Sequence, residues 1–359
     1  IRKEVIIMQE RLARMRELMA QHDQPAVLLH KPENFRYLSG YAGEGCALVT
    51  RDRQYIFTDF RYVEQAEIQA PGWTVVKTDK AMPLYTALSN AISDAHVEKV
   101  AAETDFISVD TYEQIKKAAG ETKLESLKAK PEDLRMVKDA GEIECLRRAE
   151  SITARSFNEV LGHIKPGMTE IELRAELEYI MLKLGAHGFG FDTIIASGKN
   201  GSICHAVPSE KKIEVGDFIT MDYGATYNGY TADMTRTVAL GNVTDEMKHV
   251  YNVVLEAQQK ALDSMGPGKL CCDLDKVARD HIEAAGYGEY FGHSLGHATG
   301  LMIHEAPGCS WVNKTELKPG MSMTVEPGIY LPGKFGVRIE DLVIIEQSGV
   351  SNLALEAPK

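Results

Sequence analysis

The fold is decided by the stretch Val215-Gly-Asp-Phe-Ile-Thr-Met-Asp-Tyr-Gly224, whose pattern returns as Pro319-Gly-Met-Ser-Met-Thr-Val-Glu-Pro-Gly328. The two stretches share glycine at the second and tenth positions, threonine at the sixth and a carboxylate at the eighth. Four matches at one offset indicate an internal duplication, in which Asp222 corresponds to Glu326.

The residues upstream of each stretch carry the same duplication. Residues 166–185 and 267–286 both open with Pro-Gly and both end in a glycine 18 residues after the first one. A long amphipathic helix is predicted before each segment, over residues 141–164 and 244–265. The sequence therefore predicts a duplicated α-α-β-β unit whose halves face each other and share one centre.

A two-residue turn fixes which side chains of the first half share a face. Asn228-Gly229 lies between two predicted strands, residues 217–227 and 230–240, and is a strong signal for a type I′ hairpin. A two-residue turn places Asp222 opposite Thr235 and Asp233 opposite Gly224. Asp222 and Asp233 are then diagonal neighbours, ~7–8 Å apart. Two carboxylates on one buried face repel each other unless a cation joins them.

The second half adds two more carboxylates. Glu326 is expected on the strand equivalent to that of Asp222, and Glu340 on the returning strand, although the loop with Pro332-Gly333 leaves its facing side open. Two divalent ions would balance four converging carboxylates, and such ions, ~3.5–4 Å apart, clamp and deprotonate a water. A single Asp or Glu is usually a solvated or ion-paired residue, so the prediction depends on the whole set.

A histidine-rich segment offers the nitrogen ligand that such a centre needs. Residues 291–304 contain His293, His297 and His304 among regularly spaced glycines. The glycines argue against a helix and favour an extended backbone that approaches a ligand or metal closely.

The rest of the chain predicts a second, smaller domain. Residues 1–130 alternate helical and β-type runs, such as 26–29 and 47–50, and indicate an α/β domain without a readable chemical cluster. The basic, proline-containing residues 128–131 mark the boundary, so the second domain spans residues 131–359.

Charge and cysteine usage narrow the function classes. The net charge of −12 argues against nucleic acid or an anionic membrane as the main partner. No uncharged run near the N-terminus reaches signal-peptide or membrane length. Six scattered cysteines are expected to be reduced thiols of a cytoplasmic protein: Cys46, Cys145, Cys204, Cys271, Cys272 and Cys309.

Several stretches resemble the metal-dependent Xaa-Pro peptidases, prolidase and aminopeptidase P, which share the pita-bread fold with methionine aminopeptidase. The resemblance is carried by residues 221–225, 229–237, 292–305, 325–328 and 336–341, in the order and spacing of that family. It extends to residues 34–40 and 57–62, which are similar to the N-terminal domain of bacterial members.

The resemblance implies an α+β protein with a pita-bread metallopeptidase domain and an N-terminal domain that caps the cleft and supports a homodimer. It implies catalytic roles for His205, His304 and Glu326, and substrate binding by His293 and Arg338. The implied metal ligands are Asp222, Asp233, His297, Glu326 and Glu340. One nitrogen among oxygens favours manganese, with cobalt, iron or zinc also able to bind.

The expected activity is that of an Xaa-Pro aminopeptidase. A hydroxide bridging two metal ions would attack the bond before a proline in the second position of a short peptide. Xaa-Pro dipeptidase (prolidase) is the alternative, because length does not show whether residues may follow the proline. A non-catalytic paralogue that binds a partner in the cleft is the alternative from another class. The intact ligand set argues against it, as it does against a creatine-hydrolysing relative.

Overall fold

The computed structural model describes residues 2–359, with side chains described from residue 6 onward. The chain divides into two compact units, Ile1–Arg135 and Met136–Lys359, and each is described by itself. The expected boundary after residue 130 falls directly before the short helix α6 (Pro131–Arg135), which the division assigns to the smaller unit. Over residues 2–359, no helix is both long and apolar enough to cross a bilayer.

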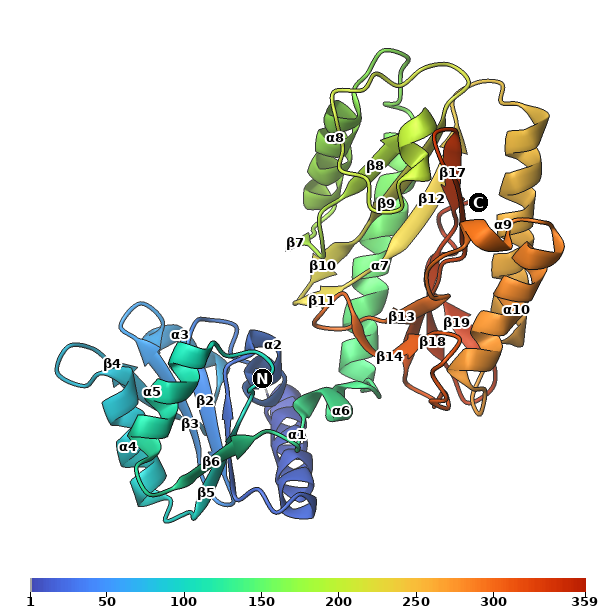
Figure 1. The fold of residues 1–359 in the computed structure, drawn as a ribbon. Helices are drawn as coiled ribbons and strands as arrows, with labels where there is room; N and C mark the ends of the chain where they lie inside the picture. Colours follow the sequence, from blue (N-terminus) through green and yellow to red (C-terminus); the bar gives the residue numbers. More distant parts are fainter. Residues whose placement is uncertain (1) are drawn as a thin grey trace. The chain divides into compact units, whose positions relative to one another are not determined.

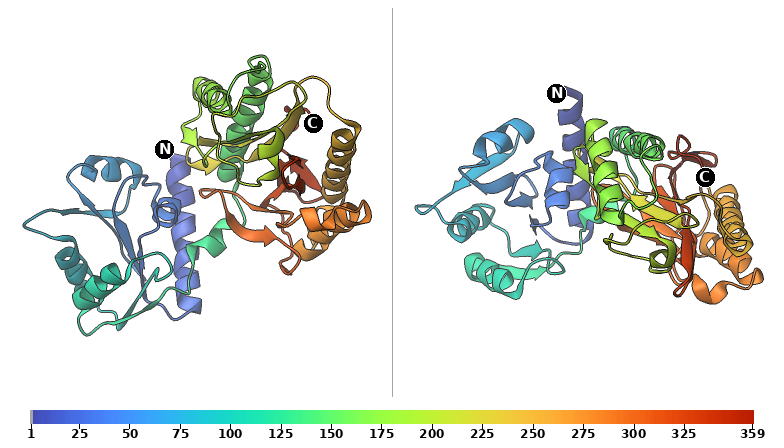
Figure 2. Two further views of the ribbon diagram at one scale, coloured as in Figure 1. Left: turned by 45° about the horizontal axis from the view of Figure 1, so that its top comes forward. Right: turned by 90° about the horizontal axis from the view of Figure 1, so that it is seen from above.

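The smaller unit contains a six-stranded mixed sheet with the order β4-β3-β2-β1-β5-β6. The central strand β1 is Ala-Val-Leu-Leu with all four residues buried, so both faces of the sheet must be covered. Figure 2 shows α1 on one side of this sheet and α4 and α5 on the other, an α/β arrangement that confirms the prediction. The strands are β1 (Ala26–Leu29), β2 (Cys46–Thr50), β3 (Gln54–Asp59), β4 (Thr74–Thr78), β5 (Lys99–Ala102) and β6 (Lys123–Ser126). The helices before α6 are α1 (Arg2–Gln21), α2 (Pro32–Ser39), α3 (Val63–Gln69), α4 (Leu84–Asp94) and α5 (Val109–Ala119).

The first half of the larger unit consists of two helices followed by antiparallel strands (Figure 1). Alternate residues of β9, such as Met221 and Tyr223, pack against the helix pair, so Asp222 faces the opposite side. The elements are α7 (Ala140–Val160), α8 (Glu170–Lys183), β7 (Gly188–Phe189), β8 (Ile194–Ser197), η1 (Gly198–Ser202), β9 (Phe218–Tyr223), β10 (Ala225–Tyr227), β11 (Tyr230–Thr231) and β12 (Met234–Ala239).

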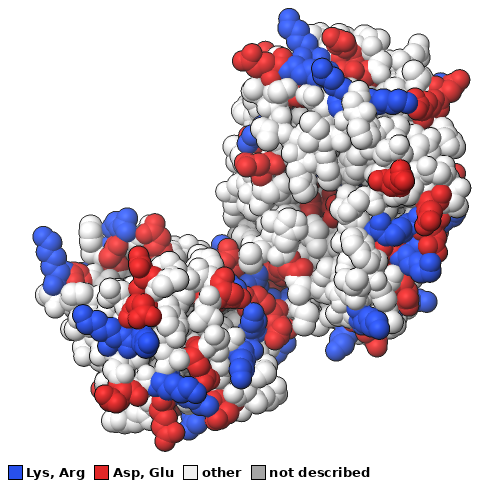
Figure 3. Space-filling model, in the orientation of Figure 1, with Lys and Arg blue, Asp and Glu red and all other residues white. Residues whose placement is uncertain are grey.

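The second half repeats the plan with its own helix pair and its own core. Its elements are α9 (Asp245–Ser264), α10 (Cys271–Ala284), η2 (Gly288–Tyr290), β13 (Gly296–Ala298), β14 (Glu305–Cys309), β15 (Ser322–Val325), β16 (Gly328–Leu331), β17 (Phe335–Arg338), β18 (Asp341–Ile345) and β19 (Val350–Asn352). The predicted duplication of α-α-β-β halves is confirmed. On the face of the molecule in Figure 3, acidic and basic side chains are interspersed over each of the two units.

The register of the first hairpin agrees with the prediction, because Thr235 lies opposite Asp222 in the β9–β12 pair. The prediction of continuous strands on either side of the turn is wrong. At Gly224 the chain passes so close to the backbone of Ala232 that the strand breaks, and a Cβ at Gly224 would lie 1.7 Å from the Ala232 oxygen. Asp233 consequently lies just before β12.

The expected strand positions of the two glutamates are also wrong. Glu326 directly follows β15, and Glu340 lies between β17 and β18. The reason for the second difference is topological. Strand β17 pairs with β16 in a two-stranded sheet, whereas β18 pairs with β15 and β19, so the chain changes sheets at Glu340.

Candidate metal and substrate site

One cavity of about 450 Å³ in the larger unit collects every site residue singled out from the sequence. Its wall also contains apolar side chains and a thiol that were not among the predicted site residues, including Phe191, Ile194, Ile303 and Cys204. The predicted residues that line it are His205, Asp222, Asp233, His293, His297, His304, Glu326, Arg338 and Glu340.

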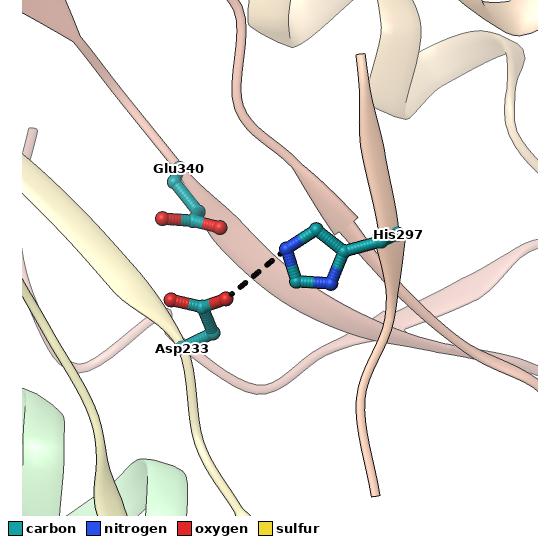
Figure 4. A group of neighbouring side chains, drawn as sticks. All are labelled: Asp233, His297 and Glu340. Atoms are coloured by element: carbon teal, nitrogen blue, oxygen red, sulfur yellow. Dashed lines mark ion pairs between the residues drawn. The ribbon is translucent and has the colours of Figure 1, made fainter. Parts of the chain in front are cut away.

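Three of these side chains form a group of the kind that can hold a metal ion. One ligand atom each of Asp233, His297 and Glu340 lies within 4.8 Å of the others (Figure 4). His297 Nε2 is 3.5 Å from Asp233 Oδ2 and 3.3 Å from Glu326 Oε1. The second ring nitrogen, Nδ1, lies 3.1 Å from the backbone oxygen of Ala298. This contact favours a proton on Nδ1 and leaves the Nε2 lone pair directed at the carboxylates.

The burial and mutual repulsion of the carboxylates in this cavity favour the binding of a cation. Burial raises the pKa values of Asp233 and Glu340 well above the usual range, and the charges of neighbouring carboxylates add to the effect. Burial likewise raises the pKa of Glu326. Within the described residues, the buried oxygens Asp222 Oδ1 and Glu340 Oε1 have no hydrogen-bond partner. Buried carboxylate oxygens without partners are costly, so this donor set fits divalent ions.

Hydroxyl and guanidinium groups behind the carboxylates fix their orientation. Thr235 Oγ1 donates to Glu340 Oε2 at 2.6 Å and accepts a hydrogen bond from Arg338 Nε at 3.0 Å. Arg338 Nη2 donates to Asp222 Oδ2 at 2.5 Å. Each of these two carboxylates therefore has one oxygen held by the protein and the other free.

Tyr330 is a site residue that sequence reasoning missed. It lies on β16, and its hydroxyl accepts a hydrogen bond from Arg338 Nη1 at 2.8 Å and lies 3.0 Å from His293 Nε2. The hydroxyl therefore connects Arg338 to His293. Its signal in the sequence was the β16–β17 hairpin, in which Gly333 has a φ of +72°. A three-residue loop with such a glycine fixes the register that the sequence interpretation left open.

Two further histidines stand on the rim of the cavity. His205 and His304 are both exposed. The His304 ring lies edge-on to His297 with 4.3 Å between ring centroids, and partial burial lowers the pKa of His304. Imidazoles in this position can hydrogen-bond to a substrate carbonyl or to its nitrogen.

Residues 144–347 match metallopeptidase family M24, and residues 11–137 match the creatinase/prolidase N-terminal domain. This chain belongs to metallopeptidase family M24. It is therefore a hydrolase of a metal-dependent family, with the pita-bread fold that was predicted.

Three proteins similar to this M24 chain are named as peptidases that act on Xaa-Pro bonds. The structure of an Xaa-Pro dipeptidase from Bacillus anthracis is 40% identical, with a TM-score of 0.94 over 98% of each chain. That of an X-Pro aminopeptidase from Thermotoga maritima is 40% identical, with a TM-score of 0.86 over 92% of this chain and 96% of the other. An Xaa-Pro dipeptidase from Pyrococcus furiosus is 37% identical over 348 residues, 96% of this chain and 98% of the relative.

Proposed function

We propose that this M24 protein is an Xaa-Pro dipeptidase, which hydrolyses the bond between a residue and a following C-terminal proline. The observation that carries the proposal is the carboxylate and histidine centre, with its unpartnered oxygens, at one small cavity. The names of the similar proteins support the dipeptidase, the alternative weighed in the sequence analysis, more than the aminopeptidase expected first.

We propose that Asp222, Asp233, His297, Glu326 and Glu340 hold two divalent ions, manganese being the metal that this donor set favours. When bound, such ions lower the pKa of a water and polarise an amide carbonyl. A metal titration followed by isothermal calorimetry should show two sites per chain.

The chain's own residues would move the protons and orient the peptide. Glu326, whose pKa is raised by burial, would accept the proton of the water and pass it to the leaving nitrogen. His205 and His304 would donate hydrogen bonds to the carbonyl oxygen as negative charge develops there. His293 would contact the proline side of the substrate, and Arg338, which also lines the cavity, would bind the substrate carboxylate. The Tyr330 hydroxyl, which lies between Arg338 and His293, would keep the two side chains in place.

Substrate length is the test of the proposal. The manganese-loaded protein should cleave an Xaa-Pro dipeptide and leave an Xaa-Pro-Yaa-Yaa tetrapeptide intact, measured by release of the N-terminal residue. Equal cleavage of both would establish an aminopeptidase instead, which the Thermotoga maritima relative supports. No cleavage of either by fully loaded protein would favour the non-catalytic binding paralogue.

The smaller unit and the cellular setting complete the proposal. We propose that residues 1–130 cap the cleft and take part in a homodimer. Light scattering of the purified protein tests whether a dimer forms. All six cysteines are free thiols, and reduced thiols support a cytoplasmic protein. Fractionation of cells followed by immunoblotting tests this location.

A further inference from the structure

Glu170 is a buried carboxylate that lies outside the cavity and collects hydrogen bonds from one loop. It is the first residue of α8 and is fully buried. Its Oε1 accepts from the backbone and hydroxyl of Ser197, at 2.7 and 2.9 Å. Its Oε2 accepts from the backbone and hydroxyl of Ser209, at 3.0 and 2.7 Å. Asn200 Nδ2 lies 3.2 and 3.1 Å from the two oxygens.

These bonds close the loop that carries His205. Asn200 and Ser209 flank it on either side, and the single carboxylate of Glu170 joins them. Among the hydrogen bonds of the described residues, none holds the exposed imidazole of His205. The position of this ring over the cavity therefore depends on the backbone of its loop.

Helix capping does not explain why the carboxylate of Glu170 is buried. The N-terminus of α8 is already capped by Thr169, whose hydroxyl accepts from the backbone of Glu172, while the Glu172 carboxylate accepts from the backbone of Thr169. A capping box satisfies these orphan donors reciprocally. The carboxylate of Glu170 is thus left for the loop, and burying it is favourable only while the loop's donors stay in place.

The second half of the duplication has a comparable arrangement. Asp275 lies on α10, is fully buried and accepts from the backbone of Leu295 at 3.0 Å. Its partner Arg279 donates to the carbonyl oxygens of Phe291 and His293, at 2.9 and 2.8 Å. The second helix of each half thus holds the loop that presents a histidine to the cavity.

We propose that Glu170 is a positioning residue for His205, as Asp275 with Arg279 is for His293. The inference rests on the proposed function, because it assigns the two loops to substrate binding and turnover. A displaced loop would misplace His205 relative to the scissile carbonyl, and a misplacement of about 1 Å lowers a rate on the order of 100-fold.

A double-mutant cycle between Glu170→Gln and His205→Ala tests the proposal on manganese-loaded protein with an Xaa-Pro dipeptide. Glu170→Gln keeps the size of the side chain but replaces one acceptor oxygen by a donor. We expect it to lower kcat/KM by about 10-fold to 100-fold when His205 is present, and to have little further effect when His205 is replaced by Ala. The manganese dissociation constant should be unchanged, because the loop contains no proposed ligand.

Glu172→Gln is the matched control, since it alters a carboxylate of the same helical turn whose hydrogen bonds, among the described residues, are to Thr169 alone. It should retain kcat/KM. If Glu170→Gln does not fold, Ser209→Ala removes one bond to Glu170 and enters the same cycle. Equal losses in both backgrounds, or a loss of manganese affinity in Glu170→Gln, would overturn the positioning role. A wild type that is inactive on the dipeptide would instead contradict the proposed function.

Discussion

At the scale of single residues, the hydroxyl of Thr235 determines how Glu340 presents its free oxygen. Thr235 Oγ1 donates to one oxygen of Glu340, which leaves Oε1 without a partner. We expect Thr235→Val to weaken manganese binding by about 10-fold to 100-fold, the usual cost of losing a group that orients a metal ligand. Calorimetric titration of metal-free protein measures the loss.

Thr237→Val is the control for this substitution. Thr237 lies two residues further along β12, and its hydroxyl contacts Thr220 and the backbone of Arg338 rather than a carboxylate. If both valine variants lost the same affinity, a general loosening of the strand would be responsible rather than the bond to Glu340.

Charged and imidazole side chains were the part of the site that the sequence could reveal. Asp222 and Asp233 follow from the turn, and all the residues singled out line one cavity. Thr235 and Tyr330 could not be found in the same way, because an uncharged hydroxyl reveals its function only through its partners. The bond of Thr235 to Glu340 spans 105 positions, and that of Tyr330 to His293 spans 37.

At the scale of elements, the hairpin register depends on the close approach of two backbones at Gly224. A Cβ there would lie 1.7 Å from the oxygen of Ala232. We expect Gly224→Ala to force the strands apart next to Asp222 and Asp233, with a loss of stability of about 1–3 kcal/mol and weaker manganese binding. Chemical denaturation and metal titration measure the two effects.

Gly308→Ala provides the comparison at this scale. Gly308 lies on β14 opposite His297, and nothing approaches the position of its missing Cβ within 4 Å. This variant should keep its metal affinity. A similar loss in both variants would show that strand glycines here act through chain flexibility rather than through space.

The elements themselves were predictable where a local signal sets them. The strand predicted at residues 26–29 is β1 without change, and the Asn228-Gly229 turn fixes the facing of Asp222. The break at Gly224 and the change of sheet at Glu340 depend on contacts between strands distant in sequence. A period-two pattern cannot show where a strand leaves one partner for another.

At the scale of the whole molecule, we expect the stability of the smaller unit to depend on pH and that of the larger unit to depend on metal. In the smaller unit, burial lowers the pKa of His30 to about 4. The unfolded chain, with a pKa of about 6.5, takes up its proton first as the pH falls. The stability from neutral His30 is therefore complete above a pH of about 6.5 and is lost towards a pH of about 4, a change of about 3 kcal/mol.

Replacing His30 tests this dependence. Urea unfolding of wild type and His30→Leu should be compared at about pH 7 and about pH 4.5, with Trp73 as the fluorescent probe of this unit and Trp311 replaced by Phe. The stability of the wild type relative to the variant should fall at the lower pH. A difference that does not change with pH would mean that His30 takes up a proton as readily in the folded state as in the unfolded chain.

The larger unit should respond to metal, because every proposed ligand lies within Met136–Lys359. A ligand that binds only the folded state stabilises it by about 2.7 kcal/mol at a concentration 100 times its dissociation constant. The chain has one tryptophan in each unit, Trp73 and Trp311. With single-tryptophan variants, manganese should raise the unfolding midpoint reported by Trp311 and leave that reported by Trp73 in place, while chelation should remove the difference. An equal shift at both tryptophans would show that metal binding stabilises the two units as one cooperative body. A shift at neither tryptophan would contradict the proposed metal centre, on which the hydrolytic function depends.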